Sequence, residues 1–237
     1  MLIRPLTLAA LLAVALVAPP ALASAQYDPS APPRPGGGVV RGPGPQGITF
    51  SARLGYGIPS GPISDEGDGA LDDLVDWKVP LWVEVGFRFN PQVWGGLYLE
   101  LASTSVNDAF CLPGRSCDAS DIRFGLDLQL HLRPYRPIDP WIGIGFGVEV
   151  LRAEAFDLGA NDISEFSYAG LELPLLEGGV DVALSPYVSM GPYVSWSLGT
   201  FTSFRVETPG LSDIDGRIDD RALHSWFEVG VKGTLKL

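Results

Sequence analysis

This 237-residue chain lacks a run of 18 apolar residues after its N-terminal stretch, so a transmembrane helix is not expected in the mature protein. It also has few basic residues: 16 Lys and Arg stand against 28 Asp and Glu, for a formal net charge of −12. That balance argues against nucleic acid as a partner, because a phosphate backbone selects cationic surfaces. Its apolar residues, 46% of the chain, must be spread over shorter segments.

Residues that commonly carry catalysis or bind metals are equally scarce. The chain has two histidines and two cysteines, and it contains no G-x-S-x-G motif. The adjacent pair His224-Ser225 cannot easily form a catalytic dyad on a strand, because neighbouring side chains point to opposite faces. We therefore predict that the protein is not an enzyme and uses no cofactor.

The N-terminus has the pattern of a secretory signal. Arg4 supplies a positive charge, a short apolar region follows, and an Ala-Ser-Ala cleavage site precedes Gln26. We predict a signal peptide over residues 1–25, a Pro/Gly-rich flexible leader over 26–47 and a folded domain over 48–237. The alternative to a cleaved signal is a retained anchor, for which the apolar region is short.

The two cysteines, Cys111 and Cys117, flank a Pro-Gly turn that would bring them together. Export would permit a disulfide. Their spacing is wider than that of a C-x-x-C redox pair, and neither His131 nor His224 is near enough in sequence to complete a metal site. We predict a structural disulfide, worth roughly 2–3 kcal/mol by the loop-entropy estimate.

The stretch from Asp121 to Arg133 alternates apolar and polar residues, with the apolar parity running from Ile122 to Leu132. Successive side chains of a strand point to opposite faces, so this period predicts a strand with one apolar and one polar face. The alternation recurs along the chain. It predicts eight strands, at about residues 48–56, 79–89, 93–104, 121–133, 141–152, 166–184, 187–204 and 222–237. The parity slips within the sixth, which predicts a one-residue bulge near Pro174–Gly178.

The connections between the strands alternate between long segments and tight turns. The long segments are residues 57–78, 105–120, 153–165 and 206–221. Aromatic residues near both ends are predicted to form two interfacial belts. They are Phe89, Trp94, Tyr135, Trp141 and Tyr187 near the short turns, and Tyr56, Trp77, Phe166, Tyr168, Phe201 and Phe204 near the long segments.

The polar parity mixes glycine, serine and charges of both signs, whereas a solvent-facing surface would carry more Lys and Glu. With the repeats PWIGIGFGVEV and PYVSMGPYVSW, which begin at Pro140 and Pro186, the meander resembles small eight-stranded outer-membrane barrels of the OmpA/OmpX type. The resemblance covers about residues 48–237. It implies an all-β, eight-stranded, antiparallel up-and-down transmembrane β-barrel, without the peptidoglycan-binding domain. Family members often end on an aromatic residue, whereas this sequence ends on Leu237.

The polar parity would line the lumen of such a barrel. Charges of both signs there must pair or be hydrated, and eight strands leave a lumen only about wide enough for side chains. We therefore predict a side-chain-filled lumen; the alternative is a narrow ion path through the same residues. The predicted charge network consists of Arg53, Glu84, Arg88, Glu100, Arg123, Asp127, His131, Arg133, Glu149, Asp181, Glu228 and Lys232.

The long segments are strongly acidic: they hold 17 of the 28 acidic residues and 4 of the 16 Lys and Arg. Solvated loops are one interpretation. The other is divalent-cation bridging to lipopolysaccharide, since carboxylate oxygens suit Ca²⁺ and Mg²⁺. The best local cluster is Asp213, Asp215, Asp219 and Asp220, which lacks the spacing of an EF-hand.

These features predict a monomeric structural or adhesive barrel in the outer membrane of a Gram-negative bacterium, with membrane lipid and lipopolysaccharide as partners. One alternative is a small porin-like diffusion channel for ions or small solutes. Another is a soluble exported ligand-binding barrel, which also has eight alternating strands. The three differ in which face of the wall is apolar and in whether the lumen is open.

Overall fold

The computed structural model describes residues 46–63, 70–107, 111, 115–157, 162–207 and 213–237. The predicted signal peptide and nearly all of the predicted leader lie outside them. The strands are β1 (Gly47–Ser60), β2 (Val75–Arg88), β3 (Val93–Val106), β4 (Arg115–His131), β5 (Ile138–Asp157), β6 (Asp162–Ala183), β7 (Val188–Glu207), β8 (Ile214–Arg217) and β9 (His224–Lys236). A short helix, α1 (Leu71–Leu74), precedes β2. No helix in the described ranges is long and apolar enough to cross a membrane.

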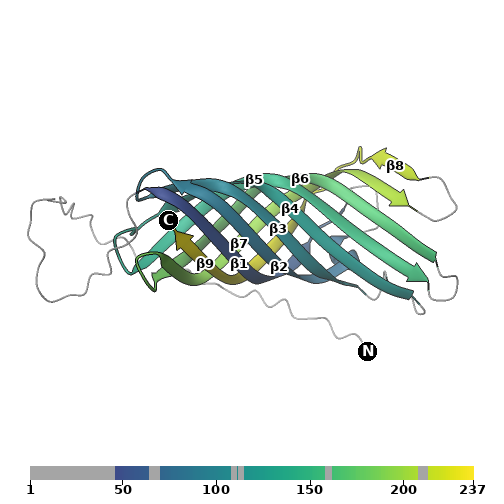
Figure 1. Ribbon diagram of the computed structural model, residues 1–237. Helices are drawn as coiled ribbons and strands as arrows, with labels where there is room; N and C mark the ends of the chain where they lie inside the picture. The colour runs from purple at the N-terminus through teal and green to yellow at the C-terminus, as the bar shows by residue number, and fades with distance from the viewer. Residues whose placement is uncertain (1–45, 64–69, 108–110, 112–114, 158–161, 208–212) are drawn as a thin grey trace, which may run out of the picture. The chain divides into compact units, whose positions relative to one another are not determined.

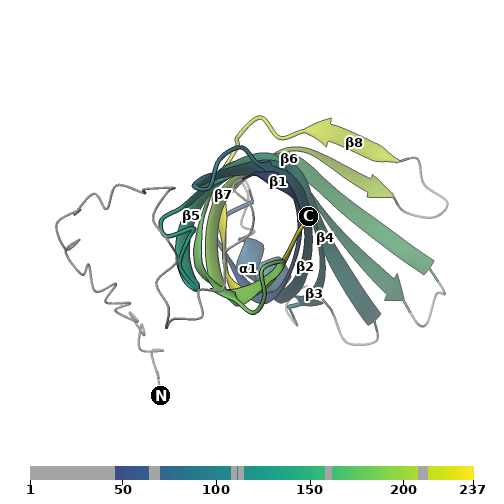
Figure 2. The ribbon, with the colours of Figure 1, turned by 60° about the vertical axis from the view of Figure 1, so that its left-hand side comes forward.

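Eight of the strands close into a barrel (Figures 1 and 2). Around the wall they follow one another in the order β1, β2, β3, β4, β5, β6, β7 and β9, and β9 pairs with β1. Every neighbouring pair is antiparallel. The predicted eight-stranded up-and-down barrel is therefore confirmed. The ninth strand, β8, pairs only with β7 and lies beyond the barrel wall.

The outer wall is apolar, as β4 shows. Its alternate residues Phe124, Leu126, Leu128 and Leu130 are 42–53% exposed, whereas Asp127 on the opposite face is 4% exposed. The same alternation holds in the other barrel strands, so large apolar side chains cover the outside and polar ones fill the inside. This is the wall of a transmembrane barrel, and it is the reverse of a soluble barrel, whose apolar face would line the interior.

The strands on one side of the barrel extend further toward the long loops than predicted. β4, β5, β6 and β7 have 17, 20, 22 and 20 residues, whereas β1, β2 and β3 have 14 each. Together with β8, the extra length forms a sheet that rises above the rest of the rim (Figures 1 and 2). We name it the projecting sheet, and the two ends of the barrel the long-loop end and the short-turn end.

Side-chain polarity inverts where β5 enters the projecting sheet. The outward residue Val150 is followed by outward Arg152 and Glu154, while the inward residue Glu149 is followed by inward Leu151 and Ala153. The strand keeps its alternation and its pairing with β4 through this point. An apolar outside and polar inside therefore become a polar outside and apolar inside, which marks where lipid gives way to water.

Large inward aromatic residues lie over glycines of their own strand and of the neighbouring strand. The Trp94 ring covers Gly86 and Gly96, and a Cβ on Gly96 would lie 2.6 Å from Trp94 Cη2. The predicted aromatic belts are therefore partly wrong. Trp94 and Trp141 are 3% and 1% exposed and fill the lumen at the short-turn end.

Phe201 is fully buried near the long-loop end. The outer wall instead exposes Phe89, Tyr135 and Tyr187 at the short-turn end, and Tyr56 and Trp77 at the other. Strand parity thus decided the direction of these side chains, and closeness to a turn did not.

A bulge in β6 lies between Glu172 and Leu175, where β6 has one more residue than β5 and β7 opposite it. The prediction placed it slightly later in the strand. The extra residue changes the parity, so Glu172 and Glu177, an odd number of residues apart, both point inward and are buried. The bulge thereby brings two carboxylates into the lumen from one strand.

Candidate functional site: the occluded lumen

The lumen is filled with charged side chains. Ten carboxylates and six Lys or Arg side chains are buried in it, together with His131 and His224. Of the twelve predicted network residues, Arg53, Glu84, Arg88, Glu100, Arg123, Asp127, His131, Glu149, Asp181, Glu228 and Lys232 are all buried inside. Arg133 is the exception: β4 ends at His131, so Arg133 lies exposed in the following turn.

An upper ion cluster lies toward the long-loop end. It consists of Lys78, Glu100, Asp121, Arg123, Glu172 and Glu228, contributed by five different strands. Lys78 Nζ lies 2.6 Å from Glu100 Oε1, 2.7 Å from Asp121 Oδ2 and 2.9 Å from Glu228 Oε1. Arg123 pairs with Glu100, with Nη2 2.7 Å from Oε2, and also with Asp121, Glu172 and Glu228. These contacts join strands on opposite sides of the barrel.

A lower ion cluster lies nearer the short-turn end and consists of Arg53, Glu84, Asp127, Glu177 and Lys232. The carboxylate oxygens of Glu84, Asp127 and Glu177 lie within 4.8 Å of one another, close enough to hold a metal ion. The Arg53 guanidinium pairs with all three, with Nη2 3.5 Å from Asp127 Oδ2. A cation of the chain therefore already neutralises the position that a metal would take.

Aromatic rings separate and cover the two ion clusters. Trp82 lies between them, with the Arg53 guanidinium 5.0 Å and the Arg123 guanidinium 5.6 Å from its ring centroid. Lys78 Nζ lies 4.1 Å from the Trp226 ring, and Lys232 Nζ 4.4 Å from the Trp141 ring. Cations against aromatic faces gain further electrostatic stabilisation where water is excluded.

The segment before β2 closes the lumen at the long-loop end. The N–H of Leu71 donates to Gly61 O at 2.8 Å, which turns the chain back into the barrel mouth. Leu71 and Leu74 are 0% and 6% exposed and join a cluster with Leu151 and Phe201 from the barrel wall. Figure 2 shows α1 inside the ring of strands. The helix is therefore an apolar plug above the upper ion cluster.

Each histidine is held by a carboxylate. His224 Nε2 lies 2.8 Å from Glu149 Oε2 beneath the plug, and His131 Nδ1 lies 2.8 Å from Asp139 Oδ2 at the short-turn end. Within the described part of the chain, no serine, threonine or cysteine hydrogen-bonds to either imidazole. The pairs therefore resemble two thirds of a catalytic triad without the nucleophile.

Little space is left in the lumen beside the lower ion cluster, toward the short-turn end. A cavity beside Trp94, Gln129 and Lys232 has a volume of about 10 Å³, which is about the space of one water molecule. The lumen holds four more carboxylates than Lys and Arg, so any ion path through it would favour cations.

Several network residues were missed by the sequence reasoning: Lys78, Asp121, Asp139, Glu172, Glu177, His224 and Lys236. Lys78 was assigned to a long loop, although it continues the inward parity of Trp82 and Glu84 on β2. Glu172 and Glu177 were missed because the bulge in β6 obscures their common direction. Extending each alternation to its last residue would have found Lys78.

The predicted sites at the long-loop end have different outcomes. The disulfide between Cys111 and Cys117 is confirmed. Asp213, Asp215, Asp219 and Asp220 are all exposed. Among the residues with described positions, no three of these carboxylates converge as Glu84, Asp127 and Glu177 do. The divalent-cation site stays a prediction.

Comparisons with known proteins bear on the fold. No family model and no curated protein matches the sequence. The structure is similar to a major outer membrane protein from Thermus thermophilus, with a TM-score of 0.52 and 12% identity over 79% of this chain and 99% of that chain. Neisserial surface protein A matches with a TM-score of 0.49 and 15% identity, over 82% of this chain and 99% of that chain. OprG from Pseudomonas aeruginosa matches with a TM-score of 0.49 and 14% identity, over 84% of this chain and 100% of that chain.

Proposed function

We propose that this chain is a structural or adhesive β-barrel of the bacterial outer membrane, with a closed lumen and no catalytic activity. The Thermus neighbour is an outer membrane protein of the same fold, and the apolar wall supports the same location here. In this orientation the short turns face the periplasm and the projecting sheet faces outward, as in barrels with short periplasmic turns and longer outer loops.

One observation carries the proposal of a closed lumen: Arg123 pairs with carboxylates of β3, β4, β6 and β9 at once. Its side chain is 1% exposed, so the contacts are shielded from water. An ion crossing this layer would have to separate buried charge pairs, each worth several kcal/mol when one partner is removed. Passive diffusion through the lumen is therefore disfavoured. The remaining candidate for a functional surface is the outer one.

The projecting sheet is the surface proposed for adhesion. It presents polar and charged residues outward, among them Arg152, Glu154 and Arg205, on strands held by regular pairing. We also propose that Asp213 and Asp215 at its edge, with Asp219 and Asp220, contact lipopolysaccharide through divalent cations. Calorimetric titration with Ca²⁺ tests this point: heat that disappears when all four are changed to Asn supports it, and no heat removes it.

Planar-bilayer recording with the purified full chain tests the main proposal. We expect a silent membrane, while discrete, regular openings would favour the diffusion channel. A gel that compares heated and unheated samples from the membrane fraction tests insertion, because folded barrels migrate differently from unfolded ones. A chain that stays in the soluble fraction would remove the outer-membrane location.

A further inference from the structure

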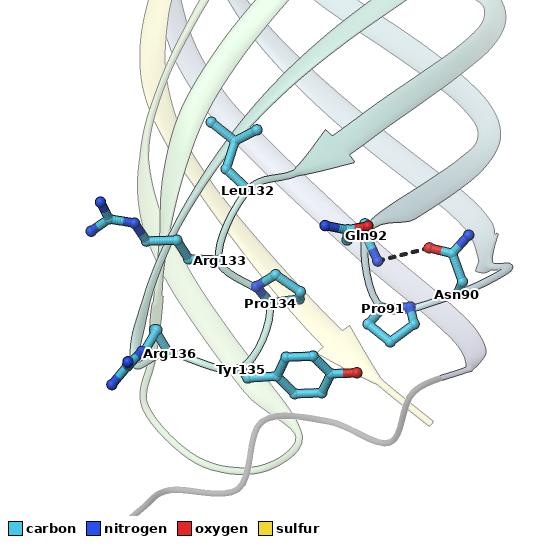
Figure 3. A pocket seen from close by; sticks show the side chains of 8 residues that line it. All are labelled: Asn90, Pro91, Gln92, Leu132, Arg133, Pro134, Tyr135 and Arg136. Carbon is cyan, nitrogen blue, oxygen red and sulfur yellow. Dashed lines mark hydrogen bonds between the residues drawn. The ribbon is translucent and has the colours of Figure 1, made fainter. Parts of the chain in front are cut away.

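A pocket lies at the short-turn end, between the turn that joins β2 to β3 and the turn that joins β4 to β5 (Figure 3). Residues 90–92 and 132–136 line it, and its volume is about 520 Å³. Sites for small molecules typically measure about 300–1,000 Å³. The size therefore suits a small polar group such as a lipid head group.

Hydrogen bonds fix the pocket before anything binds. Asn90 Oδ1 accepts from the N–H groups of Gln92 and Val93 at 2.9 and 2.8 Å. The N–H of His131 donates to Gln92 O at 2.7 Å and joins the two turns. The N–H of Arg136 donates to Arg133 O at 2.9 Å and closes the second turn. A ligand would meet a preformed site, which lowers the entropic cost of binding.

Two arginines of the pocket have no carboxylate partner for their side chains in the described part of the chain. Arg133 and Arg136 are exposed, and neither pairs with a carboxylate of the described chain. Figure 3 shows both side chains pointing to the same side of the turn that joins β4 to β5, away from Asn90 and Gln92. The nearest carboxylate along the chain, Asp139, is 7% exposed and already accepts from the Arg133 N–H and pairs with His131. The turns at residues 89–92, 132–137 and 184–187 contain no Asp or Glu, so this end is locally cationic.

The position of the pocket indicates which anion it would meet. Leu132 and Ile138 beside it are 50% and 55% exposed on the apolar wall, and Tyr135 in the turn is 63% exposed. Exposed tyrosines mark the level of lipid head groups in barrels. A guanidinium binds phosphate oxygens through two parallel N–H bonds. Both arginines therefore lie where lipid phosphates lie.

We propose that this short-turn pocket binds the phosphate of an anionic glycerophospholipid in the adjacent membrane leaflet, through Arg133 and Arg136. The inference rests on the membrane location proposed above. Leu132 and Pro134, on the same turn, contact the glycerol and the start of the acyl chains. Removing one arginine should weaken binding about fivefold and removing both about 25-fold, the usual effect of basic residues at an anionic lipid surface.

Native mass spectrometry of the full chain folded in detergent tests the proposal. Phosphatidylglycerol or phosphatidylcholine with identical acyl chains is added, and retained lipid is counted. We expect the wild type to retain phosphatidylglycerol preferentially, and Arg133→Gln/Arg136→Gln to lose that preference. The control, Arg205→Gln/Arg217→Gln, removes the same charge at the long-loop end and should keep it.

An unchanged preference in the Arg133→Gln/Arg136→Gln variant, or an equal loss in the control, would overturn the proposal. Displacement by inorganic phosphate as effective as that by added phosphatidylglycerol would overturn the lipid assignment. If the double variant does not fold, Arg136→Gln alone gives the same test, with an expected loss of lipid binding of about fivefold. The assay needs no membrane insertion, so its result is independent of the fractionation experiment on location.

Discussion

Replacing Arg123 by methionine tests whether the lumen is a dry, cross-linked core. The substitution keeps an unbranched side chain but removes the cation that pairs with Glu100, Asp121, Glu172 and Glu228. Lys78 still lies within 2.9 Å of three of these carboxylates. Glu172 loses its ion-pair partner in the described chain and keeps the Tyr98 hydroxyl, which donates to Glu172 Oε2 at 2.6 Å.

Removing one partner of a buried ion pair typically costs about 3–5 kcal/mol, whereas an exposed pair contributes about 0–1 kcal/mol. The side chains of Arg123 and Glu172 are both 1% exposed, so we expect the larger loss. The double variant Arg123→Met/Glu172→Gln should recover about 1–3 kcal/mol, the usual penalty for a buried polar group left without its partner. It removes the stranded charge and leaves an acceptor for Tyr98.

Urea unfolding in lipid vesicles, followed by tryptophan fluorescence, measures both changes. Arg152→Met is the matched control because Arg152 is exposed on the outer face of the projecting sheet, and it should alter stability by less than about 0.5 kcal/mol. A loss below about 1 kcal/mol for Arg123→Met would show that water screens the cluster. The reasoning for a closed lumen would then fail.

Three further substitutions probe the wall, the glycines and the plug. Leu128→Arg places a charge on the lipid-facing wall and should cost about 2–4 kcal/mol in the vesicle assay, whereas Ser167→Arg, outward on the projecting sheet, should be nearly neutral; equal costs would contradict the apolar band. Gly96→Ala should cost about 1–3 kcal/mol because its Cβ would overlap the Val85 backbone oxygen and the Trp94 ring. Gly178→Ala, whose Cβ would have its nearest atom at 3.4 Å, should cost less in the same assay, and the opposite order would refute the packing argument. Leu71→Asp should disturb the plug without opening a conducting path, since the ion clusters lie beneath it. Discrete openings in a planar bilayer would show that α1 is the main barrier.

The barrel itself was predictable from alternation alone. On β4 the apolar residues from Phe124 to Leu130 all face outward, as their parity requires. The prediction failed where the chemistry of a face changes but its direction does not. The fifth predicted strand ends at Arg152, where charge appears on the apolar parity, whereas β5 continues to Asp157.

The composition of the lumen was predictable only in part, because a parity fixes the direction of a side chain but not its partner. Arg53 and Glu177 lie 124 residues apart in the sequence and meet across the barrel, a contact set by strand register. Trp94 and Trp141 were placed in a belt because they are near turns, yet their parity already pointed them inward. The pocket between two short turns left no pattern in the sequence, since it forms only when the turns become neighbours.

Because polarity inverts within the continuous strand β5, the length of the strand and the thickness of the membrane that it crosses are set independently. The strand passes from lipid to water without a break, and only the order of side chains records the crossing, between Val150 and Arg152. Advancing one residue moves about 3.3 Å along a strand, and less along the bilayer normal because the strands tilt. Exchanging a few residues on each strand would therefore shift the boundary by one alternation. The same backbone could match bilayers of different hydrophobic thickness without any change in strand number, register or closure.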